Sequence, residues 1–279
     1  MANYYCLMAG APDVEMADDK QQAITLEDFR SQCEEVVTDH DSKLLFYFYL
    51  KQDCRNLVRL LKDHDADIEV LGNYTVEQFQ DLISSAQSMN FNVHRFPAFM
   101  SEFARNYDYN SEKDGWFAED QIMLAFYEYA RQCPNRFIRE WYALEMDVNN
   151  ILTALIARRQ GWNVADFIMG EGEVTEMIRT NNSKDFDLSL EYDYVAELMK
   201  IADEPDPVEK ERRIDAMKWR WLDETVTDIF SIEAVFAYLC KLQMMDRWER
   251  LDTENGKKRF RQIIENLRAG AEVPAEFVR

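Results

Sequence analysis

Residues 141–162 read WYALEMDVNNILTALIARRQGW, and this stretch decides the fold. Its apolar residues recur at the three- and four-residue spacing of one helix face, which predicts a long amphipathic helix. The residues of this apolar stripe are Leu144, Val148, Ile151 and Leu155. Asp147 and Asn150 lie on the flank of the stripe, three residues apart, and so on neighbouring turns of the helix.

The same pattern occurs once before, in residues 48–61, which read FYLKQDCRNLVRLL. When the two stretches are aligned without a gap, Asp53 matches Asp147 and Asn56 matches Asn150, an offset of 94 residues (150 minus 56). The apolar positions stay in register, pairing Leu50 with Leu144, Leu57 with Ile151, and Leu61 with Leu155. An apolar stripe with one Asp-x-x-Asn edge is therefore an internal repeat, which indicates related helical units.

The four polar residues of the repeat could be paired metal ligands or structural hydrogen-bonding groups. No His or Glu completes a metal coordination shell in either copy. Short polar side chains at the edge of a core stripe can bond to the backbone of a neighbouring segment and fix its docking. We therefore expect Asp53, Asn56, Asp147 and Asn150 to hold each repeat together, and we expect no metal, cofactor or catalytic residues.

Composition favours helices throughout. Only 8 Gly and 6 Pro interrupt 279 residues, and they cluster between long periodic segments. No segment shows sustained strand alternation, and the run LLFYFYL at 44–50 continues a helical stripe rather than forming a strand. The prediction is a single all-α domain over 1–279, with about ten helices in units of about 24–110, 116–202 and 206–279.

Helix starts are marked by capping residues. Thr25 and Thr75 open capping-box patterns, and Asp206 precedes Pro207 at a first helical position. Asp41 is expected to cap the helix that carries the first motif. The aromatic N-terminal dozen could pack on the body as an extended segment, and its residues decide nothing further, whereas 106–115 and 180–187 are polar connectors.

The formal net charge is −21, from 53 acidic against 32 basic residues, which opposes binding to nucleic acid or to anionic lipid. Five cysteines without a framework spacing indicate reduced thiols in the cytoplasm. The longest apolar run, 44–50, is far too short to span a membrane, and Met1 to Gly10 lacks the basic region of a signal peptide. Any association with a membrane is therefore expected through a partner.

Motifs for chemistry are missing from the sequence. None of the three histidines has a second His at the spacing of a helical metal site or a Glu three residues before it, and there is no phosphate-binding glycine loop and no nucleophile elbow. Small-molecule substrates and catalysis are not indicated. Basic clusters at 158–159, 212–220 and 257–261 are either solvated helix faces or docking surfaces for acidic partner helices.

The motif ALEMDVNNILTALIARRQG resembles the middle repeat of the C subunit of V/A-type ATPases, whose equivalent in eukaryotic V-ATPases is the d subunit. YLKQDCRNLVRLL is similar to the first repeat of that family. Residues 232–248 resemble the third in their apolar start and in Lys241, but Arg247 and Trp248 stand where Asn and Leu are expected. The aromatic N-terminus departs from the family pattern and suggests a divergent bacterial branch.

This resemblance implies a funnel or socket of three pseudo-repeated helical units. It implies a non-catalytic central-stalk rotor protein that couples the membrane rotor ring to the axle subunits during proton or other ion transport and ATP synthesis or hydrolysis. It also implies a cytoplasmic location, peripheral to the inner membrane through the ATPase complex. Two other classes of protein are also considered. One is a stand-alone cytoplasmic helical scaffold or regulatory adaptor. The other is a ferritin-like metal enzyme, but this sequence lacks the Glu-x-x-His pairs that such an enzyme requires.

Overall fold

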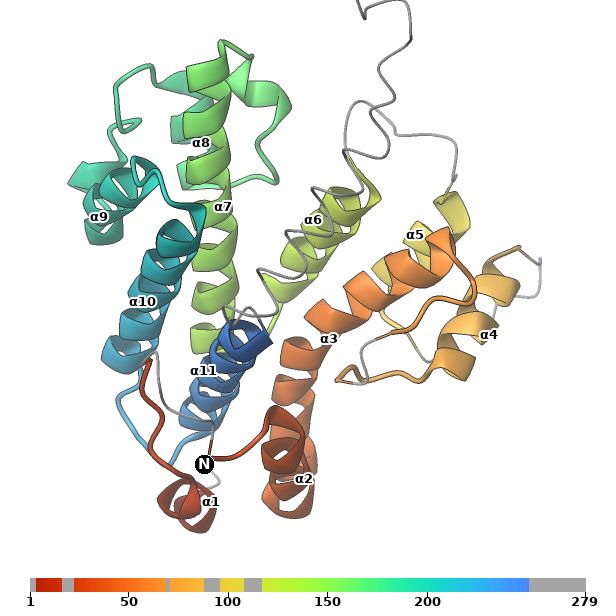
Figure 1. Ribbon diagram of the computed structural model, residues 1–279. Helices are drawn as coiled ribbons and strands as arrows, with labels where there is room; N and C mark the ends of the chain where they lie inside the picture. The colour runs from red at the N-terminus through yellow and green to blue at the C-terminus, as the bar shows by residue number, and fades with distance from the viewer. Residues whose placement is uncertain (1–3, 17–22, 69–70, 88–95, 108–116, 251–279) are drawn as a thin grey trace, which may run out of the picture.

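A computed structural model describes residues 4–16, 23–68, 71–87, 96–107 and 117–250, and these ranges are helical without any strand (Figure 1). The predicted all-α class is confirmed. The helices are α1 (Tyr5–Gly10), α2 (Leu26–Val36), α3 (Asp39–Lys62), α4 (Val76–Gln87), α5 (Ala98–Asn106), α6 (Ala118–Ala130), α7 (Arg136–Gln160), α8 (Glu173–Thr180), α9 (Asp193–Ala202), α10 (Pro207–Thr225) and α11 (Ile232–Arg250), with short 3-10 turns η3 (Val164–Asp166) and η4 (Leu188–Leu190).

Three long helices meet at the centre of the molecule. Phe236 of α11 packs edge-on against Phe48 of α3 and Tyr142 of α7, with ring centroids 6.0 and 6.1 Å apart. Successive members of this aromatic cluster are 94 residues apart (142 minus 48, and 236 minus 142). All three rings are buried, because each lies on the apolar stripe of its helix.

Two groups of helices are attached to this centre. Helices α4, α5 and α6 pack beside α3, whereas α8 and α9 pack beside α7, and α10 contacts α9 and α11. Figure 1 shows the two groups diverging from the region where α11 lies between α3 and α7. No helix in the described residues is long and apolar enough to cross a membrane.

The N-terminal segment forms a short helix, α1, where the sequence also allowed an extended segment. Tyr4 donates its amide to the carbonyl of Phe230 at 2.8 Å, and Tyr238 donates its hydroxyl to the carbonyl of Pro12 at 2.8 Å. These contacts fasten the N-terminus to the loop before α11 and to α11 itself. Local propensity does not indicate the helix, because six residues carry little periodic signal.

Most capping predictions are confirmed, and one is wrong. Thr75 and Gln78 exchange reciprocal hydrogen bonds at the start of α4, and Asp206 caps α10 ahead of Pro207. Asp41 does not cap α3. Thr38 is the N-cap, and its side chain accepts a hydrogen bond from the Asp41 amide. Asp41 therefore lies in the first turn, where its negative charge interacts favourably with the positive end of the helix dipole.

Two further differences concern segment lengths. The sequence does not predict helix α8, because its eight residues between polar loops are too few for a clear helical period. Residues 188–202 form the η4 turn followed by α9 rather than one continuous helix. The end of the expected 206–279 unit, with the basic cluster at 257–261, and all but the start of the 106–115 connector lie outside the described residues.

Candidate functional site

The Asp of the first motif fastens the connection that follows α3. Asp53 is fully buried and accepts from the Asn73 amide at 2.9 and 3.0 Å, from Asn73 Nδ2 at 2.8 Å, and from the Tyr74 amide at 3.4 Å. Burial raises the pKa of Asp53 to about 6, although the donors from Asn73 and Tyr74 act in the opposite direction. This carboxylate thereby holds the start of α4 against α3.

Gly72 allows the backbone to approach that carboxylate closely. A Cβ atom at this position would lie 2.1 Å from Asp53 Oδ1 and 3.5 Å from Asn56 Nδ2. Asn56 is fully buried at the same place and accepts from Gln52 Nε2 at 3.2 Å. The Asp and the Asn of the first motif, one turn apart on α3, therefore both lie against the turn at Gly72, as residues that fix a neighbouring segment would.

The second motif makes the same kind of contact with its Asn. The fully buried Asn150 accepts from the Met169 amide at 2.9 Å and donates Nδ2 to the Met169 carbonyl at 2.9 Å. Gly170 follows with φ +73°, in the left-handed region that favours glycine. This paired hydrogen bond holds the turn before α8 against α7.

Asp147 differs from its counterpart Asp53. Burial raises the pKa of Asp147 to about 7, offset in part by Tyr194 and Arg131. No backbone amide among the described residues donates to it, whereas Asp53 receives two. In the second copy the Asn therefore makes the backbone contacts, and the Asp is a half-buried carboxyl whose raised pKa lies near neutral pH.

The apolar members of the motif all enter the core. Each is no more than 5% exposed, because each lies on the inner stripe of its helix. These residues are Leu50, Leu57, Leu144 and Ile151. These four side chains therefore contribute to the packing of α3 and α7.

The C-terminal half of helix α11 makes polar contacts with the preceding helix, α10. Arg247 forms an ion pair with Asp215, and Trp248 Nε1 donates to the same carboxylate at 2.9 Å. Lys241 pairs with Asp223 of α10. Asp215 of α10 thus binds both Arg247 and Trp248, the two residues that stand in place of the expected Asn and Leu.

A buried charge cluster between α3, α7 and α10 was missed at the level of sequence. Lys51 Nζ lies 2.6 Å from Glu145 Oε2, and Lys218 Nζ lies 3.7 Å from Oε1. Burial favours the neutral acid, but the two ammonium groups outweigh it and lower the pKa of Glu145. Lys51 and Glu145 are 94 residues apart, which is the offset of the repeat. The opposite charges at these matched positions were the feature of the sequence that could have predicted the ion pair.

Exposed aromatic side chains follow the end of α7. Trp162 and Phe167 stack with centroids 5.4 Å apart and are 54% and 39% exposed, and Ile156 nearby on α7 is 53% exposed. The 180–187 connector lies in the same half of the molecule, fixed by Arg158, which donates to the carbonyls of Asn181 and Ser183. Exposed aromatic residues of this kind are enriched in protein interfaces.

A model of one protein family, described as a protein of unknown function (DUF2764), matches residues 1–271. The chain belongs to the DUF2764 family. No curated protein and no solved structure gives a significant match to it. The functional proposals for this DUF2764 protein therefore depend on its own residues and on the repeat described above.

Proposed function

We propose that this DUF2764 protein is the central-stalk rotor subunit of a V-type, ion-translocating ATPase. In this role it would couple the membrane ring to the axle subunits and perform no chemistry of its own. It would lie in the cytoplasm and reach the inner membrane only through the complex. Its three helical units would form a pseudo-threefold socket for the foot of the axle.

The observation that carries the proposal is the aromatic cluster of Phe48, Tyr142 and Phe236. These residues recur at a constant offset, and they meet at the junction of α3, α7 and α11. Three related units around one axis are expected to bring equivalent positions of their leading helices together at that axis. An unrelated bundle has no reason to place Phe236 in contact with two residues that precede it at multiples of one constant offset.

The charge cluster supports the same arrangement. Lys51 and Glu145 are matched positions of the repeat, and they form an ion pair where α3 and α7 approach each other. A rotor adaptor has to transmit torque between two partners, so its units need firm mutual contacts. Buried pairs with good geometry fix one relative orientation of the helices that carry them.

The direct test is an affinity purification of the tagged, full-length protein from gently solubilised native membranes. We expect the axle and ring subunits of the ATPase to be recovered with it. Recovery of neither, from membranes in which the ATPase is intact, would remove the proposal and favour a stand-alone helical scaffold. Genes for ATPase subunits beside the gene for this protein would give independent support.

A variant makes this test specific. Trp162→Ala/Phe167→Ala removes the exposed aromatic pair, and we expect it to lower recovery of one of the two partners without changing helicity. The matched control is Phe117→Ala, which removes an aromatic ring that is 58% exposed just before α6. An equal loss in both variants would remove the Trp162–Phe167 surface from the interface.

A further inference from the structure

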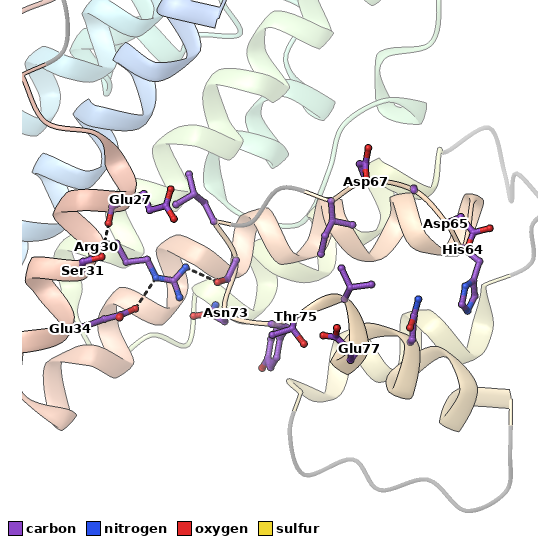
Figure 2. Close-up of a pocket in the computed structure, with 17 residues that line it drawn as sticks. Glu27, Arg30, Ser31, Glu34, His64, Asp65, Asp67, Asn73, Thr75 and Glu77 are labelled. Atoms are coloured by element: carbon purple, nitrogen blue, oxygen red, sulfur yellow. Dashed lines mark hydrogen bonds and ion pairs between the residues drawn. The ribbon is translucent and has the colours of Figure 1, made fainter.

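A groove runs between α2 and the segment that joins α3 to α4. Its volume is about 770 Å³, and its walls come from α2, residues 64–68 and residues 71–80. Figure 2 shows Glu27 and Glu34 on one side, Asp65 and Asp67 on the other, and Glu77 between them. The groove is open to solvent, and one of its walls is the turn of Gly72, Asn73 and Tyr74 that Asp53 holds.

The charge of this groove is more one-sided than that of the chain. Five carboxylates line it against one guanidinium, that of Arg30, whereas the whole chain has 53 acidic and 32 basic residues. Arg30 is already engaged, with Glu34 at 2.9 Å, the Gly72 carbonyl at 2.8 Å and the Tyr49 ring at 4.5 Å. It therefore cannot neutralise the remaining acids.

The four other carboxylates of the groove form no ion pair with any described residue. They are Glu27, Asp65, Asp67 and Glu77. Elsewhere on the surface, acids such as Glu119, Glu140 and Glu197 are matched by a Lys or Arg. A cleft lined by charges of one sign concentrates its field and attracts ligands of the opposite sign. The groove thus presents an uncompensated negative potential to a partner.

The base of the groove is partly apolar. Ile68, Leu71, Tyr74 and Val76 line it, and each is half-buried. A ligand that matches both features carries cationic side chains on its flanks and an apolar residue on the side that enters the groove. Phosphates and anionic lipid headgroups have the wrong charge, and the described residues contain no acidic cluster arranged to hold a metal ion.

We propose that this groove is the docking site for a Lys/Arg-rich amphipathic segment of a partner protein. The carboxylates of Glu27, Asp67 and Glu77 would receive its cationic groups, and the apolar base would receive its apolar side chain. The proposal goes beyond the rotor function and does not depend on it. It would stand if the membrane purification recovered no ATPase subunit.

The probe is a synthetic helical peptide with Leu on one face and Lys on its flanks, and its affinity is measured by fluorescence anisotropy at low salt. In the full-length protein, Glu27→Gln/Asp67→Asn/Glu77→Gln removes three groove charges. The control, Glu171→Gln/Glu176→Gln/Glu191→Gln, removes three exposed charges on the half of the molecule that contains α7 and α8. We expect the groove variant to weaken binding about tenfold and the control less than about twofold, because exposed ion pairs contribute little each.

Equal weakening by the two variants would show nonspecific attraction to an acidic protein and would overturn the proposal. A second variant changes Lys257, Lys258, Arg259 and Arg261 to Gln. If this variant binds the peptide about tenfold more tightly than wild type, the groove is occupied by the chain's own basic segment, and the proposal is overturned. Circular dichroism of each variant confirms folding. Hydrogen exchange of the complex should show new protection in residues 24–34 and 64–80, and protection confined to other regions would also contradict the proposal.

Discussion

Lys51 and Glu145 lie 94 residues apart, the same offset that relates the two copies of the helical motif, and their side chains form an ion pair of 2.6 Å. Both side chains are largely buried, with 15% and 9% of their surface exposed. Lys218 of α10 adds a second cation at 3.7 Å. Matched positions of α3 and α7 thus carry opposite charges, because like charges at this buried contact would repel each other.

Glu145→Ala should destabilise the protein by about 3–5 kcal/mol, because two buried ammonium groups lose their carboxylate. Urea unfolding measures this change. The matched control is Glu119→Ala, which breaks an ion pair of the same 2.6 Å length with Lys62 that is about half exposed. That control should cost less than about 1 kcal/mol. A loss from Glu145→Ala no larger than the control's would contradict a stabilising role for the cluster.

The double variant Lys51→Met/Glu145→Met refines this prediction. Replacing both charges by apolar side chains of similar length should recover more than half of the stability lost in Glu145→Ala, because removing both partners leaves only Lys218 without a carboxylate. No recovery would mean that shape at this position matters more than charge.

Gly72→Ala should destabilise the first repeat. The new Cβ would meet Asp53 Oδ1 at 2.1 Å, so the carboxylate would have to leave its donors on Asn73 and Tyr74. Loss of these bonds at a buried site should cost about 2–4 kcal/mol. Gly10→Ala is the control, because nothing lies within 4 Å of its Cβ position. Thermal unfolding should separate the two variants by several degrees, and equal melting temperatures would refute the expected clash.

Asn150→Asp should also destabilise the protein, by about 2–3 kcal/mol. The carboxylate can still accept from the Met169 amide, but it cannot donate to the Met169 carbonyl, and it is a charge placed at a fully buried position. Asn149→Asp, on the exposed side of the same turn, is the matched control and should change stability little. Chemical unfolding of the two variants side by side tests this difference.

Asp147 should make stability depend on pH. Its pKa is raised by burial from 3.8 to about 7, so the folded protein binds this proton more tightly than the unfolded chain does. The contribution to stability is therefore complete below about pH 4 and is lost as the pH rises through about 7. Asp147→Asn should remove this loss and be more stable than wild type at pH 8, by about 2 kcal/mol or more.

The measurement is the free energy of unfolding of wild type and variant at several pH values between 4 and 8. The difference between them isolates Asp147 from the general repulsion of a chain with net charge −21. Glu191→Gln, at an exposed position, provides the control for removing one negative charge. A variant with the same pH dependence as wild type would show that Asp147 does not titrate in this range.

The sequence by itself determined the helical class, most helix starts, and the residues that enter the core. These features depend on local properties: the spacing of apolar residues, the capping groups and the scarcity of Gly and Pro. It also indicated that the Asp and Asn of the motif are structural, because their types suit backbone hydrogen bonds, and Asp53 and Asn150 make such bonds.

Only the tertiary structure decided the rest. Three features depend on segments that are distant in the chain. They are the ion pair of Lys51 with Glu145, the ion pair of Arg247 with Asp215, and the groove between α2 and the α3–α4 connection. The short helices α1 and α8 form where neighbours bury their few apolar residues, because so few residues do not make a stable helix alone. Local pattern fixes which face of a helix is apolar, and packing decides which other helix covers it.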